Sequence, residues 1–242
     1  MFTVTPRPSA QDSALAEGIL QNLKLFEGVG RAVVRQAAQM SELRRLARGD
    51  IAVQRGQPAP GLCALAYGSL KIRLPQPHGD ELVLRLVGPG ETLAEAAALL
   101  GEDARLDAVA LADSMLVVIR AAGLPGLLQR DGRLSRNLAA TVAERTHGLL
   151  GELEAGLQRS SQRLACYHES IAEPGAAPGT TTARLPLSKT LLAARLGVKK
   201  ETLSRLLHQL AARGLISVAQ REIAILDRAA LLAASSDRAR NA

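Results

Sequence analysis

Three side chains with complementary hydrogen-bonding chemistry lie close together near the carboxyl end of the chain. They are Glu201, Ser204 and Arg205. At 3.6 residues per turn, this spacing places all three on one face of a helix. A carboxylate accepts from the cytosine amino group, an arginine donates two hydrogen bonds to guanine, and a serine allows close approach. The spacing predicts a base-reading helix; the alternative is an exposed Glu201–Arg205 ion pair worth about 0.3–0.5 kcal/mol.

Two short helices joined by a tight turn are predicted over residues 185–213, and they would position this face. Gly197 stands where the turn needs a positive φ, and Val198 would fill the space between the helices. The apolar positions recur at helical spacing; they are Leu191, Leu192, Leu196, Leu203, Leu206, Leu207 and Leu210. This pattern indicates a helix-turn-helix whose second helix, Lys200 to Arg213, enters a major groove of double-stranded DNA.

Basic residues are concentrated around this motif. Residues 184–228 hold nine Lys or Arg against three acids, in a chain whose net charge is +7. A localised basic surface is typical of a protein that binds a polyanion. The residues expected to contact phosphates are Ser188, Lys189, Lys199, Lys200, Thr202 and His208.

Several classes of protein are disfavoured by the composition. The two cysteines, Cys63 and Cys166, give neither a disulfide framework nor a zinc spacing. No apolar run approaches the roughly 18 residues of a membrane span, and residues 1–10 lack the apolar core of a signal peptide. We therefore expect a cytoplasmic protein without a membrane partner. No nucleophile elbow, P-loop or metal-ligand cluster is found, so we expect no enzyme.

The pattern of apolar and turn-forming residues changes several times in the chain before the motif. Residues 1–20 are expected to be largely an N-terminal tail, with helical spacing from Ser13 to Leu25 and again from Arg31 to Met40. Short apolar stretches separated by glycine turns then predict an all-β sandwich or barrel, interrupted by a helix-like segment over 93–100. The predicted strands are Ile51–Gln54, Leu62–Ala66, Leu70–Leu74, Leu82–Leu86 and Val109–Ile119.

A long helix is predicted from Leu134 to Leu157. Its apolar residues recur every three or four positions, with Arg145 among them, close to a coiled-coil seam. The simplest partner is the same helix of a second copy, and packing against the chain's own β domain is the alternative. The seam consists of Leu138, Val142, Leu149, Leu153 and Leu157.

The remaining segments complete the predicted order. A helix is expected over 160–171 and a surface loop over 173–182. After the helix-turn-helix, residues 214–218 and 222–226 have strand character and would form a hairpin, the wing of a winged helix. Residues 233–242 are expected to be a disordered tail.

This order of parts resembles the Crp/Fnr family of bacterial transcription regulators over about residues 20–232. Glu201-Thr202-Leu203-Ser204-Arg205 is similar to the recognition helix of the Fnr branch. The resemblance implies an α+β chain with three parts: a β-roll sensor (cupin-like, with the cyclic-nucleotide-binding-domain fold) over 21–130, a dimerisation helix over 131–159 and a winged helix-turn-helix over 160–232. It further implies a homodimer that reads a TTGAT–NNNN–ATCAA palindrome and acts on RNA polymerase.

The family resemblance leaves the signal open. In cyclic-nucleotide-binding members, the residues matching Glu95 and Arg105 hold the ribose and the phosphate. Here Ala94 and Leu106 depart from that cassette, and the alternative is a surface Arg105 paired with Asp103 or Asp107. An effector-independent DNA-binding protein is a further alternative.

A second branch of the family implies a different signal. No cysteine lies in residues 1–40, so the iron–sulfur cluster of the oxygen sensors is excluded. Residues 93–96 and 221–228 are similar to the Dnr-type nitric-oxide regulators, which implies haem. No pair of residues has diagnostic ligand spacing; the candidate axial ligands are His78, His147, His168, Cys63 and Cys166.

Overall fold

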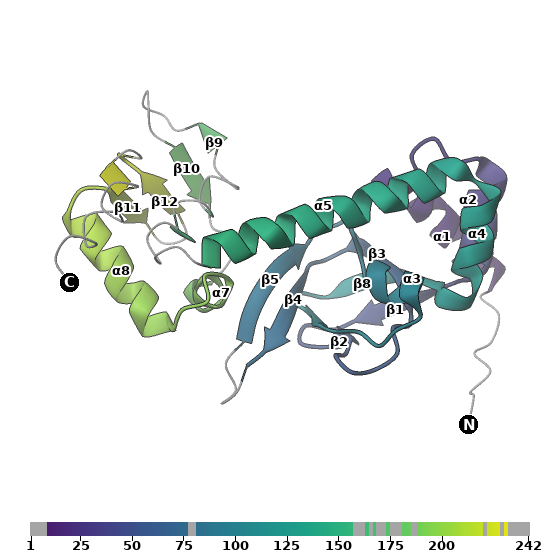
Figure 1. The fold of residues 1–242 in the computed structure, drawn as a ribbon, viewed down its shortest axis with the longest axis horizontal. Helices are drawn as coiled ribbons and strands as arrows, with labels where there is room; N and C mark the ends of the chain where they lie inside the picture. Colours follow the sequence, from purple (N-terminus) through teal and green to yellow (C-terminus); the bar gives the residue numbers. More distant parts are fainter. Residues whose placement is uncertain are drawn as a thin grey trace. The chain divides into compact units, whose positions relative to one another are not determined.

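The computed structural model describes residues 9–76, 81–156, 163–164, 167, 173–174, 181–184, 188–219, 222–227 and 230–231 (Figure 1). The chain separates into two compact units. The first comprises residues 1–75 and 84–148, and the second comprises 76–83 and 149–242. Among the described helices, none is both long and apolar enough to cross a membrane.

Residues 10–20 of the expected tail are helical, and the helical spacing predicted from Ser13 to Leu25 is confirmed in part. Helix α1 (Ala10–Gln21) starts at Ser9, whose hydroxyl accepts a hydrogen bond from the Asp12 amide. Its Ala16 and Leu20 are 1% and 0% exposed, because α1 packs on a helical cluster. A 3-10 turn (η1, Lys24–Phe26) leads to α2 (Arg31–Gln39), which confirms the second predicted helix.

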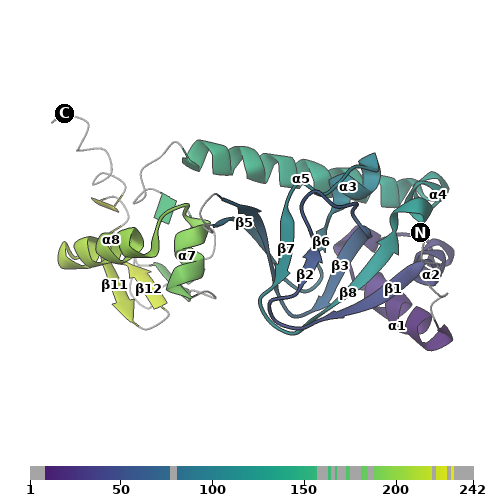
Figure 2. The same cartoon turned by 90° about the horizontal axis from the view of Figure 1, so that it is seen from below.

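Two four-stranded sheets follow, in the orders β1-β8-β3-β6 and β2-β7-β4-β5 (Figure 2). The predicted strand over 109–119 is in fact two strands, separated by a turn that ends at the buried Ser114. Two strands, β1 and β6, were not predicted. The bounds are β1 (Ser41–Leu46), β2 (Ile51–Val53), β3 (Gly61–Tyr67), β4 (Leu70–Pro75), β5 (Glu81–Val87), β6 (Thr92–Leu93), β7 (Asp107–Ala110) and β8 (Ser114–Arg120).

The sheet containing β3 and β8 is buried on both faces. In β8, Leu116 and Val118 join a core that the two sheets share, while Val117 and Ile119 join the core formed with the helices. This alternation follows from the period-2 geometry of a strand. It explains why both strands carry apolar residues on both faces over most of their length.

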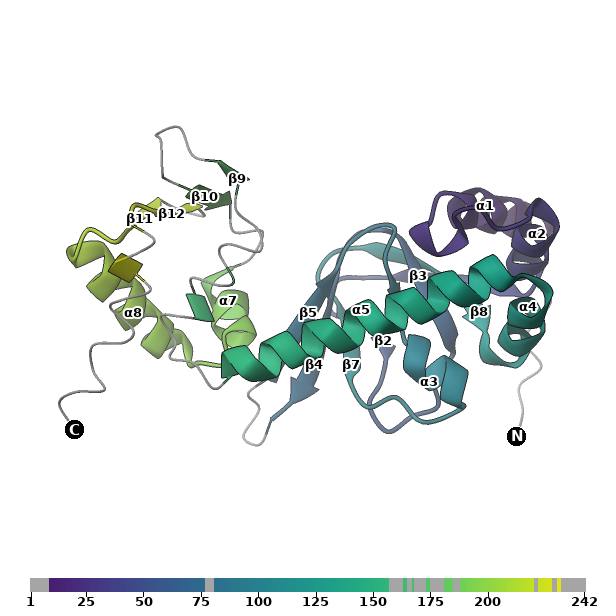
Figure 3. The same cartoon turned by 45° about the horizontal axis from the view of Figure 1, so that its top comes forward.

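Helices cover the second face of that sheet. They are α3 (Glu95–Leu100), the 3-10 turn η3 (Ala121–Gly123), α4 (Leu124–Arg130) and the long α5 (Gly132–Gly156). Figure 3 shows α1, α2 and α4 gathered around the first turns of α5, where Leu134 and Leu138 are buried. The predicted long helix is confirmed, and its first half packs on the chain's own β domain, which was the alternative to a dimer seam.

The second unit contains α7 (Lys189–Arg195), α8 (Lys200–Ala212) and a sheet of order β11-β12-β10-β9. The predicted hairpin is confirmed as β11 (Ile216–Ala219) and β12 (Glu222–Ile225), which pair antiparallel. The loop prediction over 173–182 is wrong in part, since β9 (Glu173–Pro174) and β10 (Thr181–Arg184) extend this sheet. Most of 160–171 and all of 233–242 lie outside the described residues.

Candidate nucleic-acid interface

Helices α7 and α8 are joined by the predicted turn. Gly197 has a φ of +62°, the left-handed conformation that glycine adopts without a Cβ clash. The next residue, Val198, is half-buried against the core of this unit and donates its amide to the Ala193 carbonyl at 3.0 Å. The turn thus fixes the angle at which α8 leaves α7, as a helix-turn-helix requires.

One stripe of α8 is buried and the opposite stripe is exposed. Leu203, Leu207 and Leu210 are 1%, 5% and 3% exposed and pack on the sheet and on α7. The exposed stripe, which we call the reading face, consists of Glu201, Ser204, Arg205 and His208. Its i, i+3, i+4, i+7 spacing brings the three predicted base-reading residues together, with His208 one turn further on.

The charges of the reading face have no internal partner. The alternative interpretation of Glu201 and Arg205 was a mutual ion pair, yet neither takes part in any ion pair or side-chain hydrogen bond with the described residues. Both side chains are exposed on a helix whose fold is held by its other face. They are therefore available to an external partner at no cost in internal contacts.

Five of the six predicted phosphate contacts lie at or near the helix starts, and His208 lies in the second half of α8. Lys189, Lys199, Lys200 and His208 are exposed, and Thr202 is half-buried. The Ser188 hydroxyl caps α7 by accepting from the Leu191 amide at 3.3 Å, and its own proton stays available to an acceptor. Exposed lysines beside a helix N-terminus favour contact with phosphate groups.

The two predicted effector residues lie in different surroundings. Glu95 begins α3 and is 7% exposed, and its Oε1 accepts from Thr92 Oγ1 at 2.6 Å. By contrast, the Arg105 side chain is 85% exposed and pairs with Glu102 at 3.3 Å, so its partner is neither Asp103 nor Asp107. No contact among the described residues joins Arg105 to Glu95.

The backbone at Ala94 agrees with the predicted correspondence to a glycine. Ala94 is the only described non-glycine residue with a positive φ, at 63°. An L-residue in this region bears a steric cost of about 1–2 kcal/mol. The backbone at Ala94 is therefore in a conformation that glycine would adopt without this cost.

Sequence reasoning missed the charged residues that surround Glu95. Arg145 of α5 and Arg85 of β5 both contact Glu91 and the Thr92 carbonyl. The available signal was an arginine within an otherwise apolar helical stripe. Its partners could not be inferred from the sequence, because they lie more than fifty positions away.

The seam predicted on α5 divides into two parts. Leu138 is 2% exposed and Val142 is half-buried against the same cluster, so both face the chain's own core. Leu149 is 46% exposed, and Leu150 next to it is 52% exposed. The side chain of Leu153 and the whole of Leu157 lie outside the described residues.

In the described part of the chain, the candidate haem ligands do not form an iron-binding arrangement. Cys63 is fully buried, and burial raises the pKa of its thiol to about 12. His147 is exposed on α5, and the described residues contain no cluster of three or more His, Cys, Asp or Glu that could hold a metal. His78, His168 and Cys166 lie outside the described residues.

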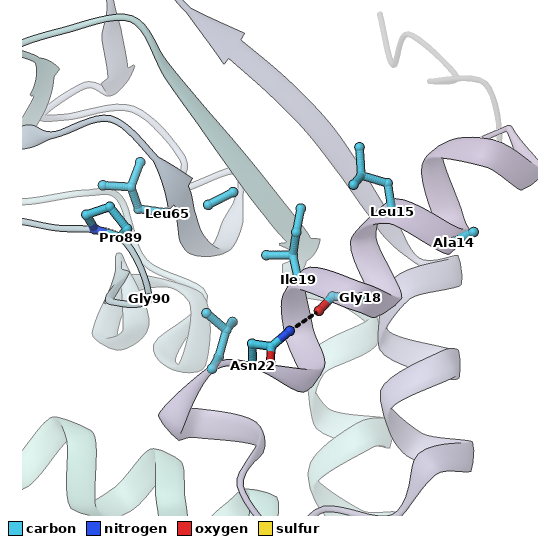
Figure 4. A pocket seen from close by; sticks show the side chains of 10 residues that line it. Ala14, Leu15, Gly18, Ile19, Asn22, Leu65, Pro89 and Gly90 are labelled. Atoms are coloured by element: carbon cyan, nitrogen blue, oxygen red, sulfur yellow. Dashed lines mark hydrogen bonds between the residues drawn. The ribbon is translucent and has the colours of Figure 1, made fainter.

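An open groove of about 490 Å³ lies beside α1 (Figure 4). Leu15 and Ile19 of α1 and Asn22 directly after it face Leu65 and Pro89 across the groove, and the Asn22 amide nitrogen donates to the Gly18 carbonyl at 2.8 Å. None of its ten lining residues is a His, Cys, Met or Tyr. The groove therefore provides no axial ligand for a haem.

The comparisons with known proteins agree with this division of the chain. Residues 43–131 match the model of the cyclic nucleotide-binding domain, and residues 144–234 match that of the Crp-like helix-turn-helix domain. The transcriptional regulatory protein btr of Bordetella pertussis is 30% identical over 214 residues, which cover 79% of this chain and 83% of that protein. The cyclic AMP receptor protein of Thermus thermophilus is 29% identical over 211 residues, with coverages of 84% and 94%.

A solved structure shares the fold at lower identity. The structure of a CooA mutant from Carboxydothermus hydrogenoformans superposes with a TM-score of 0.72 at 16% identity, covering 88% of this chain and 94% of that one. The two domain matches lie on the two units, and the relatives named above are transcription regulators. This chain is a member of the Crp/Fnr family of DNA-binding transcription regulators, with a cyclic-nucleotide-binding-type sensor domain and a Crp-like helix-turn-helix.

Proposed function

We propose that this protein is a homodimer whose two α8 helices read the half-sites of a TTGAT–NNNN–ATCAA palindrome. The observation that carries the proposal is the reading face, on which Glu201, Ser204 and Arg205 are exposed together and without internal partners. As a family member that regulates transcription, the protein would act through RNA polymerase at such sites.

The chemistry of the reading face suits this half-site. Arg205 can donate in parallel to O6 and N7 of a guanine, and Glu201 can accept from a cytosine amino group. Ser204 lies between them and adds little bulk, so the helix can approach the base edges. The lysines at the start of α8 would hold the backbone phosphates, which sets the register without specifying sequence.

Two copies are needed because a palindrome presents its half-sites about one helical turn apart. The exposed Leu149 and Leu150 of α5 support a seam between two copies, since a monomer would leave both in water. Leu138 and Val142 are not part of this proposed seam, because both pack on the chain's own core.

The signal is not part of this proposal. Glu95 accepts from Thr92 and Arg105 pairs with Glu102, so no contact among the described residues joins them, and a cyclic-nucleotide response stays a prediction of the sequence. No observation among the described residues favours haem, so the nitric-oxide response stays a prediction of the sequence.

A titration with labelled duplexes tests the proposal. Arg205→Ala should weaken binding to the palindrome by about 1–3 kcal/mol while changing binding to scrambled DNA much less. Arg213→Ala is the matched control: it removes the same charge from an exposed residue at the end of α8, off the reading face. Equal losses on both duplexes, or equal effects of both variants, would refute specific reading by this face.

A further inference from the structure

The groove beside α1 lies between two walls that the protein's own contacts hold in place (Figure 4). On one side, α1 is anchored through Leu20, which is 0% exposed in the helical cluster. On the other side, the Gly90 amide donates to the Leu65 carbonyl at 2.8 Å, and the Leu65 amide donates to the Glu91 carbonyl at 2.9 Å. The groove is therefore formed before anything binds in it.

The surface of this groove is apolar and partly open to solvent. Leu15 is 47% exposed, and Ile19 faces Pro89 across the groove. None of the ten lining residues carries a charged side chain. The hydrophobic effect therefore favours an occupant that covers this surface with apolar groups and brings no charge into it.

Gly18 leaves room in the wall that α1 forms. It lies within the helix and lines the groove, although glycine lowers the stability of a helix interior. A Cβ built at Gly18 would meet no atom within 4 Å, so packing within the described part of the chain does not require a glycine here. A missing side chain allows the backbone of another segment to approach the helix closely.

The eight residues before Ser9 have a pattern that suits this groove. They read Met-Phe-Thr-Val-Thr-Pro-Arg-Pro and lie outside the described residues. Phe2 and Val4 are two positions apart, a spacing that places both on one face of an extended segment. Each proline favours an extended conformation in the residue before it, which here means Thr5 and Arg7. The only charged side chain, that of Arg7, is close to the helix start and away from the two apolar residues.

The length of this segment also matches the groove. A helix rises about 1.5 Å per residue, whereas an extended chain advances about 3.3 Å. The rise from Ser9 to Asn22 is therefore about 20 Å, and the extended chain from Ser9 back to Phe2 spans about 23 Å. A chain that reverses at Ser9 brings Val4 near the level of Gly18 and Phe2 near the level of Asn22.

We propose that residues 1–8 turn back at Ser9 and dock in the α1 groove of their own chain. Phe2 and Val4 cover its apolar surface, and the backbone of the segment passes over Gly18. The groove is then filled by the protein itself, so a small apolar molecule would have to displace the segment to enter. This inference concerns the β domain alone and does not rest on the DNA-binding function proposed above.

A single tryptophan tests the proposal, because the chain has none of its own. Phe2→Trp is made in the full-length protein, and its emission and its quenching by acrylamide are measured. Leu15→Glu, added to this variant, places a charge in the groove at an exposed position where the fold should tolerate it. Leu100→Glu is the matched control, since Leu100 is a 68% exposed leucine of α3 that does not line the groove. Thermal melts verify that all three proteins fold.

The reference is a synthetic peptide of residues 1–8 with the same Phe2→Trp substitution. We expect the tryptophan in the protein to emit at a shorter wavelength than in the peptide and to be quenched less by acrylamide, because it is shielded from water. Leu15→Glu should abolish both differences. Leu100→Glu should leave both unchanged.

Three results would overturn the inference. The first is a tryptophan that emits and is quenched as in the free peptide. The second is a shift in emission that survives Leu15→Glu, which would place the segment outside the groove. The third comes from mixing Phe2→Trp with an excess of Leu15→Glu protein: loss of the shift would mean that the segment docks on a second copy, whereas docking in its own chain leaves the shift intact.

Discussion

The two charged regions of this molecule differ in how their charges are satisfied. On α8, Glu201 and Arg205 are exposed and form no ion pair with the described residues, and leucines on the other face hold the helix. Around Glu95, two arginines and two glutamates are joined by ion pairs. Charges left without a partner are available to a ligand, whereas charges that satisfy one another hold the fold together. Whether a charged residue can bind a ligand is therefore predicted better by its existing contacts than by its location.

The largest expected effect is on stability. It would show whether one face of α8 supports the fold and the other is free to read DNA. Leu203→Ala removes a side chain that is 1% exposed and should destabilise the second unit by about 2–5 kcal/mol. Ser204→Ala, its exposed neighbour, should change stability by no more than about 0.5 kcal/mol. Urea unfolding of both variants measures this. Similar losses would mean that the reading face also supports the fold.

A second variant separates base reading from simple charge. Glu201→Ala removes the side-chain acceptor, so discrimination at the matching cytosine should fall by about 1–3 kcal/mol. Affinity for random DNA should rise, because a negative charge near the phosphates has gone. Competition titrations with single-base substitutions measure both effects. A uniform change across all duplexes would contradict a reading role for Glu201.

A third variant probes the strained residue beside the charged cluster. Ala94→Gly should stabilise the protein by up to about 1 kcal/mol, because glycine adopts the φ of 63° without the steric cost. Ala96→Gly, an exposed position within α3, should instead lose about 1 kcal/mol of helix propensity. Thermal melts report both signs. Equal destabilisation would show that Ala94 is not strained.

The smallest expected effect concerns the exposed arginine that the sequence placed in an effector pocket. Arg105→Ala should alter stability by less than about 0.5 kcal/mol, since its pair with Glu102 is exposed to solvent. Cyclic AMP should shift the melting temperature of neither wild type nor variant. A shift in melting temperature that depends on Arg105 would indicate that this residue belongs to a cyclic AMP site.

The helix-turn-helix could be predicted from the sequence because its signals are local. Gly197 and the leucine periodicity lie within one short segment, and the exposed and buried faces of α8 follow from helix geometry alone. The hairpin of β11 and β12 is local for the same reason. The fold class could be predicted from the order of such patterns along the chain.

The features that escaped prediction depend on distant contacts. β1 is rich in charged residues and becomes a strand only by pairing with β8, more than sixty positions away. The helical spacing of α1 was visible from Ser13 onward, but the helical cluster that buries Ala16 and Leu20 was not. Likewise, nothing near Arg145 in the sequence identifies Glu91 as its partner. Pairings of this kind are set by tertiary packing, which the spacing of residues along the chain does not encode.

The burial of Cys63 has a practical consequence. Its thiol lies in the core shared by the two sheets, and burial raises its pKa to about 12. An alkylating reagent reacts with the thiolate, so modification must wait until the domain opens and lets water reach the sulfur. The rate of labelling at this residue therefore reports how often the β domain opens. It allows the opening of the β domain to be timed without a probe being added to it.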